Sequence, residues 1–300
     1  MGSFMIRLLL ATILLAASAP AETVKWFSDP ARVNLDSTGA PMDAGFQFQL
    51  GAFTGSFVPT ASNAAQWSAN WMVADTTEYN GTTGVFDSQF ELASNAAPFT
   101  VNGKAWIWGS RTTATGSEWI LFRKSSWKWP AAGSGGPPMP ASIFWNTGEA
   151  DEVVLGAIYQ SGAPFLMQSA AVSSYAQWTA ATLSGETLTS ANDDPDHDGV
   201  ANVLEFAFGT SPLVAGPPPP ATPSWFESSG QQYLQLTVPR RRDRLALFTV
   251  EVSENLSLWQ SGASFTTVIS DLPNSWVVRD LTPRNSQHAK RFIRFSATLP

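Results

Sequence analysis

Apolar and polar residues alternate along much of the chain in short runs that predict β-strands. In FQFQL, residues 46–50, every second side chain is apolar, which is the pattern of a strand with one buried face. A mostly apolar run at residues 118–122 is typical of a strand buried on both faces. The Asn102-Gly103 pair marks a tight turn between two such runs. Many short strands at this spacing predict a β-sandwich or a barrel over residues 22–168.

A helical pattern appears only around one acidic stretch, within residues 169–214. Between Val200 and Phe208 the apolar residues recur with the spacing of one helical face, and Gly209 follows as a helix-ending residue. The serine pair at residues 173–174 can cap an earlier helix. The pattern therefore predicts a helix–loop–helix unit.

The remaining sequence predicts a spacer and a second β domain. Residues 215–223, AGPPPPATP, favour a stiff, extended form of the chain. Residues 224–300 return to alternation and predict a small β-sandwich. Strands are expected there at residues 233–238, 247–252, 265–269, 276–279 and 291–296. The predicted fold class is mainly β, with two β-sandwich-like domains joined by a short helix–loop–helix unit and a proline-rich spacer.

The loop of the helical unit has the ligand spacing of a calcium site. In DPDHDGVANVLE, residues 194–205, oxygen-bearing groups occupy positions 1, 3, 5, 7, 9 and 12 of the EF-hand template, with glycine at position 6. The expected ligands are Asp194, Asp196, Asp198, the Val200 carbonyl, Asn202 and Glu205. Carboxylates crowded in this way repel each other unless a hard cation such as Ca²⁺ lies among them. The alternative is a solvated acidic turn that only caps the following helix.

The same stretch also resembles a known type of repeat. DPDHDGVANVLEFAFGTSP, residues 194–212, resembles the bacterial thrombospondin type 3-like calcium repeat, whose pattern includes the Gly-Thr-x-Pro ending. Residues 173–300 as a whole resemble a type of secreted bacterial multidomain protein in which one such loop precedes a fibronectin type III-like sandwich. The resemblance implies an exported, calcium-stiffened protein without an established enzymatic role. It implies no ligand for residues 22–168.

The first 21 residues have the features of a secretory signal peptide. Arg7 precedes an apolar run over residues 8–17, and Ala19-Pro20-Ala21 fits a cleavage site. The chain has no cysteine, which excludes disulfides and a lipoprotein anchor. We expect a protein that is secreted or held at the cell surface, with the periplasm as an alternative. We expect no transmembrane segment in the mature chain.

The charge is low and unevenly distributed. Charged residues make up 14% of the chain, and the formal net charge is −7. Acidic residues outnumber basic ones over residues 22–220, whereas basic residues outnumber acidic ones over residues 221–300. An acidic main body argues against nucleic acid as a partner. The short basic run at residues 240–244 is expected in a hairpin loop, either solvated or docked against the acidic N-terminal domain.

Residues suited to catalysis are few. Neither His197 nor His288 has a local setting that suggests a catalytic triad, and the absence of cysteine excludes a Cys/His zinc site. A glycosidase needs two facing carboxylates. The candidates for such a pair are Glu118, Glu149, Asp151 and Glu152. Acidic residues at strand ends are usually only solvated, so we expect no enzyme.

Tryptophans concentrate between residues 106 and 145. Trp106 and Trp108 share one strand face, and so do Trp127 and Trp129, because side chains alternate along a strand. If exposed, these four indoles would form a stacking platform for an extracellular polysaccharide. If buried, they belong to the core, which is the commoner outcome.

The sequence thus favours an exported, non-enzymatic structural or adhesion protein with one structural Ca²⁺ site and cell-surface components as partners. A carbohydrate-binding protein that uses the tryptophans is the first alternative. A secreted glycoside hydrolase is the second. Exposure of the tryptophans and the placement of the carboxylates discriminate between these three functions.

Overall fold

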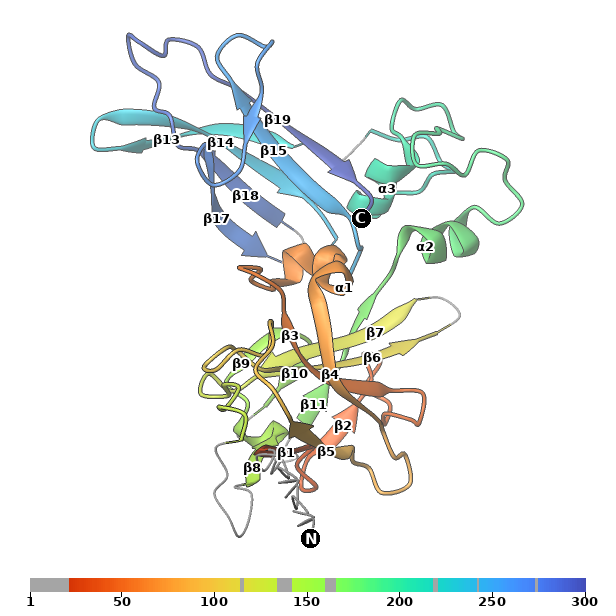
Figure 1. The fold of residues 1–300 in the computed structure, drawn as a ribbon. Helices are drawn as coiled ribbons and strands as arrows, with labels where there is room; N and C mark the ends of the chain where they lie inside the picture. Colours follow the sequence, from red (N-terminus) through yellow and green to blue (C-terminus); the bar gives the residue numbers. More distant parts are fainter. Residues whose placement is uncertain are drawn as a thin grey trace, which may run out of the picture.

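The computed structural model describes residues 22–113, 116–133, 142–159, 166–217, 221–241, 243–272 and 275–300. The fold is mainly β, with several sheets and three short α-helices in these ranges, as predicted. Figure 1 shows one group of sheets near the N-terminus, a second group near the C-terminus, and a helical unit beside the second group. The predicted signal peptide, residues 1–21, lies outside the described residues. None of the helices in the described ranges has the length and apolar character needed to cross a membrane.

The N-terminal group contains three sheets. The largest has the strand order β12-β7-β6-β3-β4, with β9 also paired to β7, and the two smaller ones have the orders β5-β1-β8 and β10-β11-β2. Their strands are β1 (Glu22–Phe27), β2 (Val33–Leu35), β3 (Gln47–Phe53), β4 (Trp71–Glu78), β5 (Asp87–Leu92), β6 (Trp106–Thr112), β7 (Ser117–Arg123), β8 (Ser142–Asn146), β9 (Glu152–Leu155), β10 (Ala157–Ile158), β11 (Leu166–Gln168) and β12 (Ala170–Val172). The short helices η1 (Ala61–Gln66), α1 (Trp67–Asn70) and η2 (Thr147–Glu149) complete this part.

The central strands of the largest sheet, β6 and β7, are buried on both faces over most of their length. One face contributes Phe48 and Phe122 to a core that also contains Trp26 of β1. The other face carries Trp108, which packs edge-on against Trp67 of α1 with ring centroids 5.7 Å apart. Because η1 and α1 cover this second face, the central strands lack the solvated side that strict apolar–polar alternation would require.

The C-terminal group is a sandwich of two antiparallel sheets. One has the order β13-β14-β18-β17 and the other the order β16-β15-β19. The strands are β13 (Thr222–Ser228), β14 (Gln231–Pro239), β15 (Leu247–Ser253), β16 (Gln260–Ser261), β17 (Thr266–Leu272), β18 (Ser275–Asp280) and β19 (Phe292–Thr298). The five strands predicted here are confirmed. Strand β13 was not predicted, and it begins inside the stretch expected to be a spacer.

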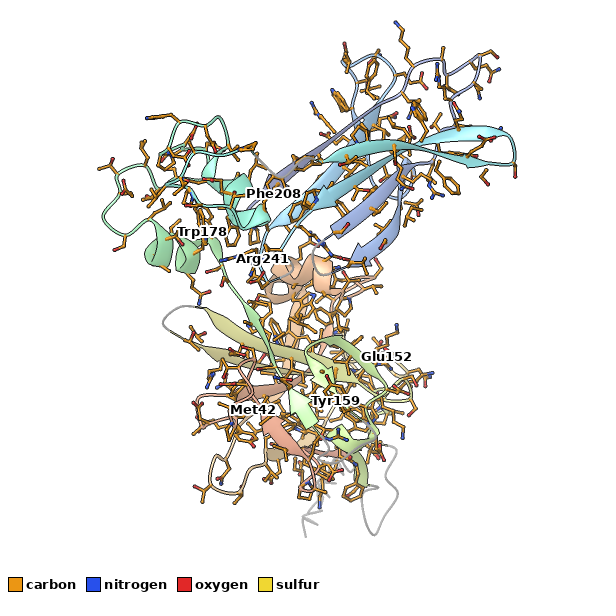
Figure 2. All side chains as sticks on the ribbon, turned by 180° about the vertical axis from the view of Figure 1, so that it is seen from behind. Met42, Glu152, Tyr159, Trp178, Phe208 and Arg241 are labelled. Atoms are coloured by element: carbon orange, nitrogen blue, oxygen red, sulfur yellow. The ribbon has the colours of Figure 1, made fainter. Side chains whose placement is uncertain are left out.

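The helical unit consists of α2 (Tyr175–Thr182) and α3 (Asn202–Phe208) with the acidic loop between them. Trp178 of α2 and Phe206 of α3 share a buried cluster with Ala246 and Ala297 of the sandwich. Phe208 extends into the sandwich core itself (Figure 2). The helical unit and the C-terminal sandwich therefore share buried side-chain clusters.

The basic hairpin between β14 and β15 joins the two halves of the chain. Ser173, just after β12, donates its N–H to the Asp243 carbonyl at 2.7 Å and accepts from the Leu245 N–H at 2.9 Å. Leu245 packs against the cluster around Trp67, and Arg241 donates its N–H to the Ala207 carbonyl of α3 at 2.9 Å. These contacts are made by backbone groups and by Leu245, whereas Arg240 and Arg241 pair with Asp271 and Asp243 of the C-terminal part. Docking of the basic run against the acidic N-terminal domain through its charges stays a prediction.

Candidate metal centre

Local capping fixes the two helices that flank the acidic loop. The Ser174 hydroxyl accepts from the Gln177 N–H at 3.2 Å, while the Gln177 side chain accepts from the Ser174 N–H at 3.0 Å. This reciprocal pair is a capping box, and it begins α2 at the predicted residue. Helix α3 ends at Gly209, whose φ of 77° is the left-handed conformation that glycine adopts without a Cβ clash.

Aromatic packing holds the helices together across the loop. Tyr175, Trp178 and Phe206 form a triangle in which every pair of ring centroids is 5.5 Å apart. The Tyr175 hydroxyl donates to the Thr189 carbonyl at 3.0 Å, which attaches the first part of the loop to α2. Contacts within the protein therefore fix both ends of the acidic loop without the help of an ion.

Three carboxylates converge within the loop. One oxygen each from Asp194, Asp196 and Asp198 lies within 4.8 Å of the other two, and all three side chains are partly buried. Backbone N–H groups orient them: Gly199 donates to Asp194 at 2.9 Å and Val200 to Asp198 at 2.8 Å. Gly199 has a φ of 88°, so the glycine at template position 6 makes the turn as expected.

Further ligand oxygens on this loop are buried and lack hydrogen-bond partners. Asp196 Oδ2, Asn202 Oδ1 and Glu205 Oε2 each have no partner among the described residues. Asn202 is fully buried, and its amide nitrogen is occupied by the Leu188 and Ser190 carbonyls at 3.2 and 3.0 Å. Buried acceptors without partners are costly and uncommon, so three of them on one loop call for a physical explanation.

Glu205 is the most perturbed of the predicted ligands. Its side chain is 1% exposed. Burial and, after it, the negative charges of the three loop aspartates, Asp196 first, together raise the pKa of Glu205 from 4.5 to about 7. The Thr210 hydroxyl donates to Glu205 Oε1 at 3.4 Å and opposes this shift of the pKa. A bound cation would remove this penalty, because it would neutralise the charge that burial disfavours.

The donor chemistry fits a hard cation. All the side-chain groups at the predicted positions are carboxylate or amide oxygens, and the Val200 carbonyl would add another. Ca²⁺ takes six to eight oxygens of these types. His197, at template position 4, is exposed and has a φ of 60°, so it lies on the outside of the turn as that position requires. The ligand set remains a prediction that these oxygens support.

Two hydrogen bonds of the loop were not predicted from the sequence. Gly216 donates its N–H to Asp198 Oδ2 at 2.9 Å, so the chain returns to the loop after α3. Asn202 was expected only as a ligand, yet its N–H also bonds the Asp193 carbonyl at 2.8 Å. Neither contact has a sequence signal, because both depend on how the chain folds back. The Gly-Thr ending did carry a signal, since Thr210 reaches Glu205.

The four candidate tryptophans do not form a surface platform. Trp106 and Trp108 are 5% and 6% exposed, and Trp127 and Trp129 are 2% and 0% exposed. The first pair lies in the cluster around Trp67, and the second pair lies in the main core. Stacking on a sugar needs an exposed ring face. The sequence correctly predicted that each pair shares one face, but the carbohydrate interpretation of these side chains is wrong.

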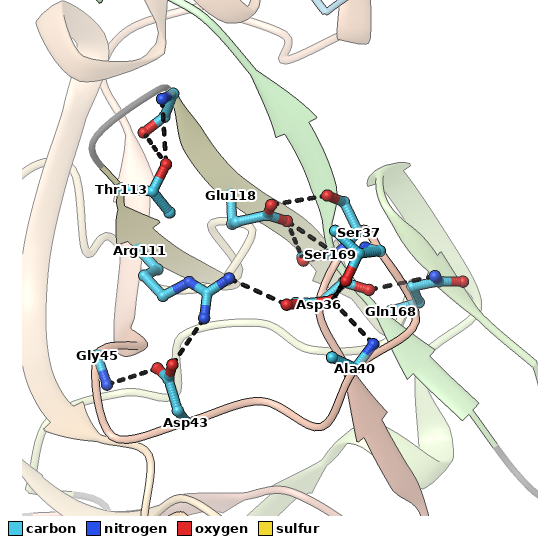
Figure 3. A network of polar contacts seen from close by, with 12 residues as sticks. Asp36, Ser37, Ala40, Asp43, Gly45, Arg111, Thr113, Glu118, Gln168 and Ser169 are labelled. Atoms are coloured by element: carbon cyan, nitrogen blue, oxygen red, sulfur yellow. Dashed lines mark hydrogen bonds and ion pairs between the residues drawn. The ribbon is translucent and has the colours of Figure 1, made fainter.

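The candidate catalytic carboxylates serve structural contacts. Glu118 is 7% exposed and accepts from Ser37 Oγ and Ser169 Oγ, both at 2.7 Å, which ties two loops to β7 (Figure 3). The other three are also engaged: Glu149 with Lys124, Asp151 with the Ser125 N–H and hydroxyl, and Glu152 with Arg123. These contacts hold the four carboxylates in place and provide no reason to assign them to catalysis.

Comparisons with known proteins add no name to this site. The chain matches no known protein-family model, and no curated protein matches it significantly. The resemblance to the thrombospondin type 3-like repeat therefore rests on the loop residues themselves.

Proposed function

We propose that this chain is an exported, non-enzymatic structural or adhesion protein whose helical unit binds one structural Ca²⁺. The observation that carries the proposal is the set of buried ligand oxygens without partners, Asp196 Oδ2, Asn202 Oδ1 and Glu205 Oε2. They lie on the loop in which three aspartate oxygens already converge. A metal ligated by oxygens would satisfy all of them at once.

The ion would act by joining the loop to the sandwich. Glu205 lies in α3, and Phe206 and Phe208 of the same helix are buried against the C-terminal sheets. Asp198 is bonded to Gly216, at the start of the segment that leads into β13. A cation shared by Asp194, Asp196, Asp198 and Glu205 would thus fix the loop to the helix that belongs to the sandwich core. Export is supported by the signal-peptide pattern and by the resemblance, which implies an extracellular calcium module.

Thermal unfolding of residues 22–300 with calcium and with chelator tests this proposal. A ligand at 100 times its Kd stabilises the folded state by about 2.7 kcal/mol. For a chain of this size, that corresponds to a rise in Tm of about 5 °C. We expect this rise in the wild type and not in Asp198→Ala. A midpoint that calcium leaves unchanged in the wild type would reject the metal site and leave an acidic helix cap.

A further inference from the structure

A pocket beside the Asn102 turn has no role in the proposed calcium site. Its volume is about 400 Å³, within the range of roughly 300–1,000 Å³ typical of ligand sites. The apolar part of its lining includes Phe53, Phe57, Pro98 and Trp106. Lys104 lies at the same pocket and is exposed. The pocket thus combines an apolar wall with a cation.

A second lysine stands directly beside the first. Lys104 and Lys128 face each other in an isolated antiparallel bridge, and both side chains are exposed. Their neighbours Ala105, Trp127 and Trp129 are buried, so the two ammonium groups point to the same, solvated side. Like charges directly opposite each other on paired strands are destabilising.

No carboxylate balances this pair. The described ranges include all 24 acidic residues of the chain, and none of them forms an ion pair with Lys104 or Lys128. By contrast, the nearby Lys124 is paired with Glu149 at 3.3 Å. A positive pair without a partner, on a domain in which acidic residues predominate, is the electrostatic arrangement expected where the ligand supplies the negative charge.

Hydroxyl groups complete the lining. Ser56 and Thr100 border the pocket, and neither hydroxyl is hydrogen-bonded to another described residue. A phosphate could accept hydrogen bonds from these hydroxyls, but it would leave the apolar wall of Phe53, Phe57 and Trp106 without a contact. A sugar ring with a carboxylate would use every group present: its C–H face against Phe57, its hydroxyls on Ser56 and Thr100, and its charge on the lysines.

We infer that this pocket binds a uronic-acid residue of an acidic polysaccharide. The site differs from the predicted tryptophan platform, because Trp106 contributes only a buried wall and the positive charge comes from Lys104 of the lining and from Lys128, which lies opposite Lys104 just outside the lining. It shares no residue with the acidic loop. A negative result for this pocket would therefore leave the calcium proposal unaffected, and the reverse also holds.

The test is isothermal titration of residues 22–300 with a hexamer of galacturonic acid. The matched ligand is the methyl ester of the same hexamer, which keeps the rings and removes the charge. No calcium is added, so that the affinity of uronates for calcium does not enter. The variants are Lys104→Ala, Lys128→Ala and their combination, with Lys290→Ala as the control, because Lys290 is an exposed lysine of the other domain. Thermal melts of each variant check folding.

We expect the acid hexamer to bind and the ester to bind at least tenfold more weakly. Each lysine variant should lose about tenfold in affinity, as for one charge-assisted hydrogen bond, and Lys290→Ala should bind as the wild type does. The calcium-site variant Glu205→Gln should also bind normally. Equal binding of acid and ester, undiminished binding by the double variant, or no binding of the acid at millimolar concentration would each overturn the inference.

Discussion

Replacing Glu205 with glutamine separates two effects of its carboxylate, the free-energy cost of burying the charge and the contribution to calcium binding. The substitution keeps the size of the side chain and removes its charge. In the metal-free fold the pKa of Glu205 is raised from 4.5 to about 7 by burial and by the loop aspartates. Because the folded-state pKa lies above the unfolded one, the metal-free fold carries no penalty below about pH 4.5. It loses stability as the pH rises through about 7.

The size of this loss follows from the shift. The difference between pKa values of 4.5 and about 7 corresponds to a loss of about 3 kcal/mol in the free energy of unfolding at pH 8. Solvent screens little of this loss, because the Glu205 side chain is buried. Metal-free Glu205→Gln should therefore exceed the metal-free wild type in stability by about 3 kcal/mol at pH 8. The two proteins should be equally stable near pH 4.

Urea unfolding in chelator and in calcium measures both effects. Extracellular calcium modules bind at about 10⁻⁴–10⁻³ M, so about 10 mM calcium reaches 100 times the Kd at the tight end of that range. There the wild type should gain about 2.7 kcal/mol, while the variant gains nothing. Glu186→Gln, an exposed site with the same change of charge, is the control and should match the wild type throughout. A metal-free variant less stable than the wild type at pH 8, or one that calcium still stabilises, would refute this reasoning.

Three further outcomes follow from the same geometry. Below about pH 7, calcium must displace a proton from Glu205 to bind. The logarithm of the calcium association constant, measured by titration, should therefore rise by about one per pH unit below pH 7 and level off above it. A flat profile from pH 5 to 8 would exclude Glu205 as a ligand. Trp108→Ala, in a buried cluster, should cost about 3–5 kcal/mol in urea unfolding, whereas Trp225→Ala, at a site 45% exposed, should cost under about 1; similar losses would contradict the assigned burial. Leu245→Asp places a charge among the side chains around Trp67, so small-angle scattering should show a larger radius of gyration; an unchanged radius would show that this contact does not hold the two halves together.

Local patterns predicted the elements whose environment is set by neighbours in sequence. Alternation placed β14, β15 and β19 to within two residues, because one face of each is buried and the other is not. The serine cap and Gly209 placed both ends of the helical unit, because caps depend on a few adjacent residues.

The features that the sequence did not predict depend on contacts with other segments of the chain. All seven residues of β13 are exposed, so the strand has no buried apolar face that a sequence pattern could have indicated. The strand is formed by its antiparallel pairing with β14. The burial of Trp106 and Trp108 depends on η1 and α1, which lie about forty residues earlier and cover that face. Likewise, no sequence pattern places Lys104 opposite Lys128, because the bridge joins segments on either side of β6 and β7.

The calcium loop lies between these two cases. Its spacing predicted the ligand types, since alternate residues of a tight loop point inward together. The spacing did not predict that Glu205 would be 1% exposed with an unpartnered oxygen, because that burial comes from the aromatic cluster of α2 and α3 and from the sandwich behind them.

The number of calcium ions bound per chain tests the proposed metal site most directly. Isothermal titration of chelator-treated residues 22–300 with calcium, repeated with Asp196→Ala and with magnesium, measures it. We expect one ion per wild-type chain, none for Asp196→Ala, and weaker binding of magnesium, which requires tighter octahedral geometry. Absence of binding at millimolar calcium, or one ion still bound by Asp196→Ala, would contradict it.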